Sequence, residues 1–126
     1  MSFTVTISKR QDGLYLIDLD GKLDTETCRE LQDKIRPLMV AQTQGFVFDL
    51  KDMDYISSSG LGVLFMVRKF TDENERTFLI TNVQPQIRKV FDIVKALPKE
   101  AIFQSMEELD DYLDAIQNKE IEKNKG

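Results

Sequence analysis

The residues best suited to chemistry in this chain are three consecutive serines, Ser57-Ser58-Ser59, followed by Gly60 and, one leucine later, by Gly62. A short apolar strand precedes them and an apolar helical segment follows. Serine hydroxyls cap the free N–H groups at the start of a helix, and glycines allow another surface close to the backbone. Because the positive end of the helix dipole favours an anion, the pattern is typical of a place that holds a phosphate.

Two other interpretations of the serine turn stay open. In the first, Ser57 or Ser58 is an ordinary N-cap and the glycines only relieve packing, since serine is a preferred cap in proteins of every function. In the second, which we disfavour, Ser58 is a nucleophile with Lys51 or Lys69 as its base. The chain carries neither a G-x-x-x-x-G-K-[ST] loop nor a G-x-G-x-x-G loop, so nucleotide hydrolysis by such a loop is not supported.

The composition excludes several classes of function. The 126 residues include no His and one Cys, which excludes Ser–His–Asp and Cys–His catalysis, His-ligated metals and an internal disulfide. Seventeen Lys and Arg against 22 Asp and Glu give a net charge of −5, which repels nucleic acid. We therefore expect no enzymatic activity, no cofactor, no metal site and no nucleic-acid partner, with Cys28 serving as inert packing.

Nothing in the chain predicts a membrane association. The N-terminus has no basic segment that leads into an apolar stretch, and no apolar run approaches the ~20 residues that a membrane span needs. We expect a cytoplasmic protein without direct membrane insertion. A single domain is predicted over residues 1–117, and the polar composition of residues 118–126 predicts a frayed tail.

Hydrophobic periodicity predicts the elements that position the serine turn. Residues 3–8 and 14–19 form a hairpin, and a helix with Asp24 or Thr25 as its cap follows Gly21. The next predicted elements are a strand at 46–50, a loop and helix at 56–70, a strand at 77–81, a helix from Pro85 and an edge strand at 101–103. A last helix follows, with Ser105 and Glu108 as its predicted capping box. Its predicted buried residues are Leu109, Tyr112, Leu113 and Ile116.

This order predicts an α/β fold, a mostly parallel mixed sheet of four or five strands with an N-terminal antiparallel hairpin and four helices. Function is expected where strands lead into helices. In the helix after the serines, the predicted core stripe consists of Leu61, Leu64 and Phe65. The helix has three further apolar residues, Val63, Met66 and Val67, and for these we favour packing in the core over a docking patch on the surface. A solvated helix face is predicted for the acidic run Glu107, Glu108, Asp110, Asp111 and Asp114.

Three segments resemble the STAS domains, and in particular the bacterial anti-sigma factor antagonists. Residues 49–64, DLKDMDYISSSGLGVL, are similar to the signature (N/D)-L-x-x-(L/V)-x-(F/Y)-(I/M)-D-S-(S/T)-G-L-G-x-(L/I). Residues 21–25, GKLDT, resemble a G-x-L-D segment, and residues 83–91, VQPQIRKVF, resemble a P-x-(V/I)-x-(K/R)-(V/L)-(F/L) helix. Length and element order agree as well, so the resemblance extends to about Gln117 and implies a STAS-type single domain.

The resemblance implies a protein that switches partners. Family members bind an anti-sigma factor that is also a serine kinase, and this releases the sigma factor; the kinase phosphorylates the first serine after the motif's aspartate, and a serine phosphatase reverses the reaction. Alignment on Gly60 and Gly62 places the acceptor at Ser58, with Ser57 and Ser59 as alternative acceptors. The implied partner-binding residues are Asp24, Thr25, Ser57, Ser58, Ser59, Gly60, Leu61 and Gly62.

One departure from the motif keeps a second hypothesis open. Ser57 takes the place of the motif's aspartate, so the carboxylate before the acceptor is missing. The alternative is therefore a STAS scaffold subunit of a transporter or signalling complex that is not phosphorylated. A third class, a small enzyme or nucleotide-binding protein, rests only on the tendency of acidic α/β domains to bind ligands at strand ends. A monomer is the favoured oligomeric state.

Overall fold

The computed structural model describes residues 3–96 and 106–125. One sheet has the strand order β1-β2-β3-β4. Strands β1 (Thr4–Lys9) and β2 (Leu14–Leu23) form an antiparallel hairpin, whereas β3 (Gly45–Ile56) and β4 (Thr77–Thr81) join β2 in parallel. The predicted mixed sheet with an N-terminal hairpin is confirmed. The edge strand predicted at 101–103 and the capping residue Ser105 lie outside the described residues.

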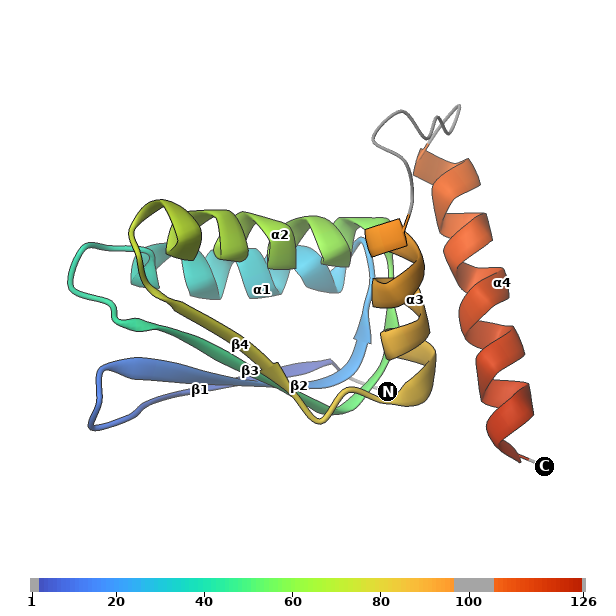
Figure 1. Cartoon of the computed structure of the whole chain (residues 1–126), viewed down its shortest axis with the longest axis horizontal. Helices are drawn as coiled ribbons and strands as arrows, with labels where there is room; N and C mark the ends of the chain where they lie inside the picture. Colours follow the sequence, from blue (N-terminus) through green and yellow to red (C-terminus); the bar gives the residue numbers. More distant parts are fainter. Residues whose placement is uncertain (1–2, 97–105, 126) are drawn as a thin grey trace.

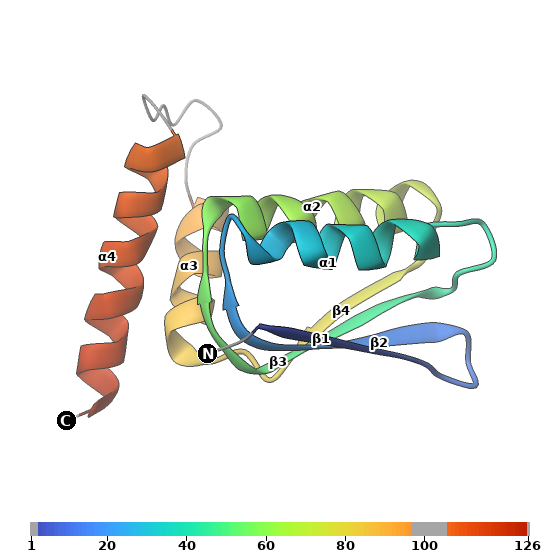
Figure 2. The same ribbon diagram turned by 180° about the vertical axis from the view of Figure 1, so that it is seen from behind.

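The helices form two groups. Helices α1 (Thr27–Ile35) and α2 (Ser58–Glu73) run side by side over one face of the sheet, and a 3-10 turn, η1 (Arg36–Leu38), follows α1 (Figure 1). Helix α3 (Pro85–Ala96) stands at one end of the sheet, and α4 (Met106–Lys125) lies along its outer side (Figure 2). The four predicted helices are therefore present, and only one face of the sheet is covered by α1 and α2.

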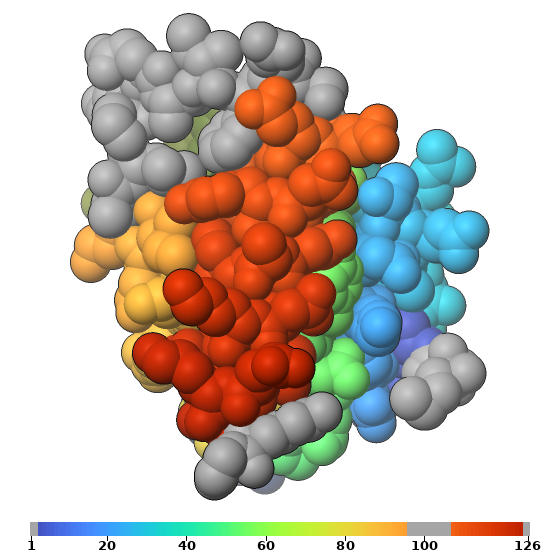
Figure 3. Space-filling view, turned by 90° about the vertical axis from the view of Figure 1, so that its right-hand side faces the viewer, coloured from blue at the N-terminus to red at the C-terminus, as the bar shows by residue number. Residues whose placement is uncertain are grey.

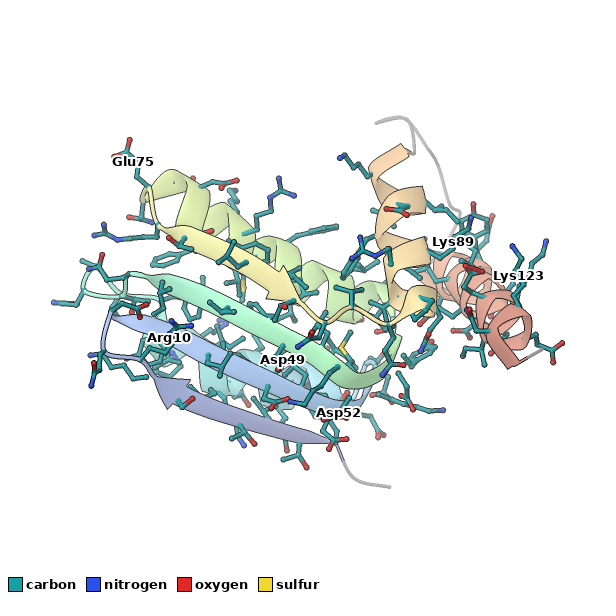
Figure 4. The ribbon with its side chains drawn as sticks, turned by 60° about the horizontal axis from the view of Figure 1, so that its bottom comes forward. Arg10, Asp49, Asp52, Glu75, Lys89 and Lys123 are labelled. Carbon is teal, nitrogen blue, oxygen red and sulfur yellow. The ribbon has the colours of Figure 1, made fainter. Side chains whose placement is uncertain are left out.

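The core lies between the sheet and its covering helices. Because alternate residues of a strand point to opposite faces, Phe46 and Phe48 of β3 enter the core together and are fully buried. Their rings pack against those of Phe70 and Phe78, with centroid separations of 6.5 and 5.8 Å. Asp49, the residue after Phe48, belongs to the opposite face of the sheet, away from α1 and α2 (Figure 4). The tightly packed β3 thus anchors the segment that leads into α2.

Strands β2 and β3 are longer than the hydrophobic pattern predicted. The predictions ended near residues 19 and 50, but the two strands stay paired as far as Leu23 and Ile56. Two irregularities in the register, between Asp18 and Asp20 and between Gly21 and Lys22, allow this pairing to continue. The extension matters because it brings two of the three segments that resemble the family motifs, residues 21–25 and 49–64, alongside each other.

Two side chains that were predicted in the core are largely exposed, namely Phe65 at 48% and Tyr112 at 39%. The predicted core positions Leu61 and Leu64 are buried, and the buried side of α2 continues through Gly60, Val63, Val67 and Thr71, so that Phe65 lies outside it. Core packing of Val63 and Val67 is confirmed.

Helix α4 also differs from expectation. It continues through Lys125, across residues whose composition predicted a frayed tail. The helix packs against α3 along its length, with Ile116 and Ile121 half-buried, and Asn124 donates a hydrogen bond to the Glu120 carbonyl at 2.9 Å. Tertiary packing therefore extends the helix further than local composition indicates. The domain boundary at residue 117 stays a prediction.

Candidate functional site

The site is built where β2 and β3 end side by side. Lys22 pairs with Tyr55 and Leu23 with Ile56 across the two parallel strands. The N–H of Ser57 continues this pairing by donating to the Leu23 carbonyl at 2.9 Å. Since parallel strands end at the same edge of a sheet, the segment that contains Asp24 and the serine turn become neighbours. The structure therefore brings together the two motif segments that are about 30 residues apart in sequence.

Ser57 is the N-cap of α2. Its backbone is extended, with φ −93° and ψ 174°, and its hydroxyl oxygen accepts the Gly60 N–H at 3.2 Å. The side chain is only 3% exposed. The hydroxyl thereby satisfies one of the N–H groups that a helix leaves free at its start. The predicted capping role of Ser57 is confirmed, and a serine performs it without the carboxylate of the family motif.

Asp24 caps the other helix at this edge. Its Oδ1 accepts the backbone N–H groups of Glu26 and Thr27, each at 3.0 Å, and its carbonyl accepts the Cys28 N–H at 2.9 Å. The predicted cap at Asp24 is confirmed, although the regular part of α1 begins only at Thr27. The neighbouring Thr25 is exposed. Two helix N-termini, each with a capped first turn, therefore open onto the same edge of the sheet.

The two glycines of the turn have different reasons to be glycine. A Cβ on Gly60 would lie 2.8 Å from Leu23 Cγ and 3.0 Å from Ile56 Cγ1, closer than ordinary side chains approach. A Cβ on Gly62 would meet no atom within 4 Å, and Gly62 is exposed on α2. The fold therefore requires Gly60, whereas Gly62 leaves free surface beside the serines.

Alanine substitutions separate these two roles. Gly60→Ala is expected to destabilise the fold by about 1–3 kcal/mol, because Leu23 and Ile56 must shift inside a packed core. Gly62→Ala is expected to stabilise it by about 0.5–1 kcal/mol, because glycine is a poor helix former and the added methyl meets open space. Urea unfolding of both variants measures the difference. Equal stabilities would contradict the assigned packing.

Ser58, the predicted phosphate acceptor, is buried. It is only 7% exposed, and its Oγ is inaccessible and has no hydrogen-bond partner within the part of the chain that the structure describes. Its backbone N–H donates to Oδ1 of Asp110, on α4, at 2.8 Å. Leu61 and Gly60 are buried beside it and Ser59 is half-buried, so Thr25 and Gly62 are the exposed members of the predicted partner-binding set.

The acidic run on α4 is only partly a solvated face, which corrects the prediction. Asp110 accepts the backbone N–H of Ser58, and Asp114 accepts a hydrogen bond from the hydroxyl of Tyr55. Burial and then this bond to Asp114 raise the pKa of Tyr55 far above its ordinary value, so the phenol stays protonated and donates. Figure 3 shows α4 spread across this side of the molecule, between α3 and the green segments of β3 and α2.

Gln117 completes the contact between α4 and the site. Its side-chain amide accepts the Ile56 N–H at 3.0 Å and donates to the Ile56 carbonyl at 2.8 Å, and the residue is 1% exposed. Positions 110, 114 and 117 are spaced i, i+4 and i+7, so they lie on one face of a helix. That spacing beside the buried Leu113 is a signal in the sequence that these three polar residues share a face with the core, although it does not show which residues they contact.

Cys28 lies beneath this edge. Its Sγ donates to the Thr25 carbonyl at 3.2 Å, and burial, followed by the negative charge of Asp24, raises the pKa of its thiol. Because the thiolate is the reactive form, the predicted role as packing is consistent with this environment. Iodoacetamide at pH 8 is expected to alkylate folded protein at least about tenfold more slowly than protein unfolded in urea. Equal rates, followed by mass spectrometry, would contradict this assignment.

The groups at this edge include serine hydroxyls, backbone N–H groups and the carboxylates of Asp24 and Asp110, which accept hydrogen bonds from such N–H groups. Lys51, a candidate base, points away from Ser58 and pairs with Asp18 and Asp49 on the sheet, at 3.4 and 3.3 Å. The hydrogen bond to Asp49 and the charge of Asp18 raise its pKa, which keeps it protonated. Within residues 3–96 and 106–125 no three His, Cys, Asp or Glu residues are placed to hold a metal ion. The serine turn fits modification or binding better than catalysis.

Comparison with known families agrees with this geometry. The profile of the STAS domain matches residues 6–109. The chain belongs to the STAS domain family. Anti-sigma-B factor antagonists of Staphylococcus aureus are 29% identical over 83 residues, which cover 66% of this chain and 77% of theirs. The protein of the same name from Staphylococcus epidermidis is 29% identical over 82 residues, or 65% of this chain and 76% of its own.

Solved structures share the fold of this STAS domain. Unphosphorylated SpoIIAA, an anti-sigma factor antagonist, superposes with a TM-score of 0.63 at 18% identity, over 88% of this chain and 98% of its own. The phosphorylated Bacillus SpoIIAA gives 0.61 at 19% identity, over 72% and 83%. A putative anti-sigma factor antagonist from Thermotoga maritima gives 0.66 at 16% identity, over 83% and 93%.

Membrane crossing is not indicated by the helices. Among those in residues 3–96 and 106–125, none has both the length and the apolar character that a crossing requires.

Proposed function

We propose that this STAS domain is an anti-sigma factor antagonist, which binds an anti-sigma factor that is also a serine kinase and thereby releases the sigma factor. The observation that carries the proposal is the serine turn, capped by Ser57 and placed beside Asp24 at the edge of the sheet. The relatives named anti-sigma-B factor antagonists support the same role. The exposed Gly62 and Thr25 leave room for a partner to approach the turn.

Phosphorylation of Ser58 is the proposed off-switch. The kinase transfers the γ-phosphoryl group of ATP: a bond forms between Ser58 Oγ and phosphorus, the bond to the β-phosphate oxygen breaks, ADP leaves, and a base of the kinase takes the hydroxyl proton. The product carries a charge of about −1.5 to −2 near the positive end of the α2 dipole, so the fold survives. A partner that covers this turn would have to desolvate the added charge, and it is therefore excluded.

The remaining properties follow from that role. A serine phosphatase restores the hydroxyl by hydrolysing the phosphate ester, with water as the second reactant and inorganic phosphate as the product. The protein itself acts as a substrate and a binding partner, not as an enzyme, and it works as a cytoplasmic monomer without a cofactor. The net charge of −5 disfavours nucleic acid as a partner.

Mass spectrometry tests the switch directly. The purified protein is incubated with ATP and a purified anti-sigma factor kinase, and the peptides around the turn are analysed. We expect one phosphate on Ser58 and none in the Ser58→Ala variant. A phosphate on Ser57 or Ser59 would move the acceptor, and the absence of phosphate from all three serines would overturn the switch.

A scaffold role is the second candidate, because Ser58 is buried and the motif's aspartate is replaced by Ser57. In that case the domain is a constitutive subunit of a transporter or signalling complex and is not phosphorylated. Purification of the tagged protein from its host distinguishes the two roles. Recovery of a transport ATPase without a kinase favours the scaffold, whereas recovery of an anti-sigma factor favours the antagonist.

A further inference from the structure

The proposed acceptor lies underneath another part of the protein. Ser58 Oγ is inaccessible and, among the described residues, has no hydrogen-bond partner, although it belongs to the turn that a kinase must reach. A kinase holds the hydroxyl in line with the γ-phosphate of ATP, so it needs direct access to Oγ. The arrangement seen here excludes that access. Some element must therefore move before the proposed reaction takes place.

Helix α4 is the described element whose side chains bond to this turn and to the end of β3. Asp110 accepts the Ser58 N–H at 2.8 Å, Asp114 accepts from Tyr55, and Gln117 binds both backbone groups of Ile56. These three side chains form one stripe of α4, and they contact the end of β3 and the first residue of α2. The contact is polar and specific, and it puts a carboxylate at the helix N-terminus, where the dipole favours an anion.

A phosphate on Ser58 would compete for the same place. The phosphate carries a charge of about −1.5 to −2, and it would be attached to Oγ of Ser58. The backbone N–H of the same residue already donates a hydrogen bond to Asp110. Two anions cannot share one end of the α2 dipole without strong repulsion, and the inaccessible Oγ leaves no space for three further oxygens. The docked position of α4 and a phosphorylated Ser58 are therefore incompatible.

We propose that α4 is a cover over Ser58 that a phosphate on Ser58 displaces, with Asp110 and the phosphate competing for the N-terminus of α2. This inference rests on the proposed switch at Ser58, and it adds a conformational step to it. The docked state hides the acceptor, so the fraction of molecules with α4 released limits the apparent affinity of the kinase. Phosphorylation then holds α4 in the released state.

Chemical labelling measures the cover without any kinase. In a Cys28→Ser background, Ser58→Cys places a thiol under α4, and iodoacetamide reports its accessibility. We expect Asp110→Ala to raise the labelling rate about tenfold, because it removes the bond that holds α4 to Ser58. Asp111→Ala is the matched control, since it removes an exposed carboxylate one position along the same helix, and it should leave the rate unchanged. Equal rates for the two alanine variants would overturn the cover.

Hydrogen exchange tests the competition separately. Ser58→Glu is expected to accelerate exchange about tenfold in peptides from residues 107–124 but not in the β1–β2 hairpin. Adding Asp110→Asn should restore part of the protection, because it removes the repulsion and keeps an oxygen that accepts the Ser58 N–H. Unchanged exchange of α4 in Ser58→Glu would overturn the proposal. Neither assay contains ATP or a kinase, so both test only whether α4 covers Ser58. The phosphorylation assay tests the switch separately, and the two proposals can therefore fail independently.

Discussion

Replacing Ser58 with aspartate is expected to weaken binding to the anti-sigma factor kinase about a hundredfold, which corresponds to about 2.7 kcal/mol. The carboxylate adds charge at a surface that the partner must desolvate, and an unpaired buried charge costs at least this much. Calorimetric titration of the wild-type and variant proteins with the purified kinase measures the change.

Ser58→Ala is the matched control. The Ser58 hydroxyl has no partner among the described residues, so its removal leaves no donor or acceptor unpaired. We expect its affinity to equal that of the wild type, and its stability to be equal or greater by up to about 1 kcal/mol. Identical affinities of the aspartate and alanine variants would refute the exclusion mechanism.

The parts of the site that could be predicted from the sequence are those that local chemistry determines. Ser57 and Asp24 act as caps because a short oxygen side chain can reach N–H groups two or three residues further along the chain, and this needs no knowledge of the fold. The hairpin and the parallel strands follow from alternation and from the order of the elements. Gly60 and Gly62 are also visible in the sequence, but only the packing of Leu23 distinguishes their roles.

The contacts of α4 could not be predicted in the same way. Asp110 and Ser58 are 52 residues apart, and the periodicity of a helix shows which residues share a face but not what that face meets. The same limit explains Phe65, whose exposure depends on how α2 is rotated against the sheet. Ser57 replaces the aspartate of the family motif, so the chain lacks a carboxylate directly before Ser58. A carboxylate nevertheless lies next to Ser58, because Asp110 of α4 supplies it.

Gln117→Ala is expected to give the second large effect, a loss of about 2–4 kcal/mol in the free energy that holds α4 against the domain. The substitution leaves the N–H and the carbonyl of Ile56 without the side chain that bonds both of them. Ile56 is fully buried, so water cannot replace these bonds while α4 stays docked. Undocking restores hydration, and the helix should therefore open more often.

Asn118→Ala separates this effect from helix propensity, because Asn118 is the next residue, is exposed on the same helix, and is also a carboxamide. In hydrogen exchange, Gln117→Ala should lose protection in α4 and around Ile56, whereas Asn118→Ala should keep it. Phe48 and its strand neighbours on the covered face of the sheet should stay protected in both variants. An equal loss in the two variants would mean that α4 is held by its apolar stripe at Leu113 and not by Gln117. A loss of protection in Gln117→Ala that is confined to α4 and its contact with Ile56, in contrast, would mean that the free energy of docking α4 is a few kcal/mol. One added phosphate can reverse an equilibrium of that size.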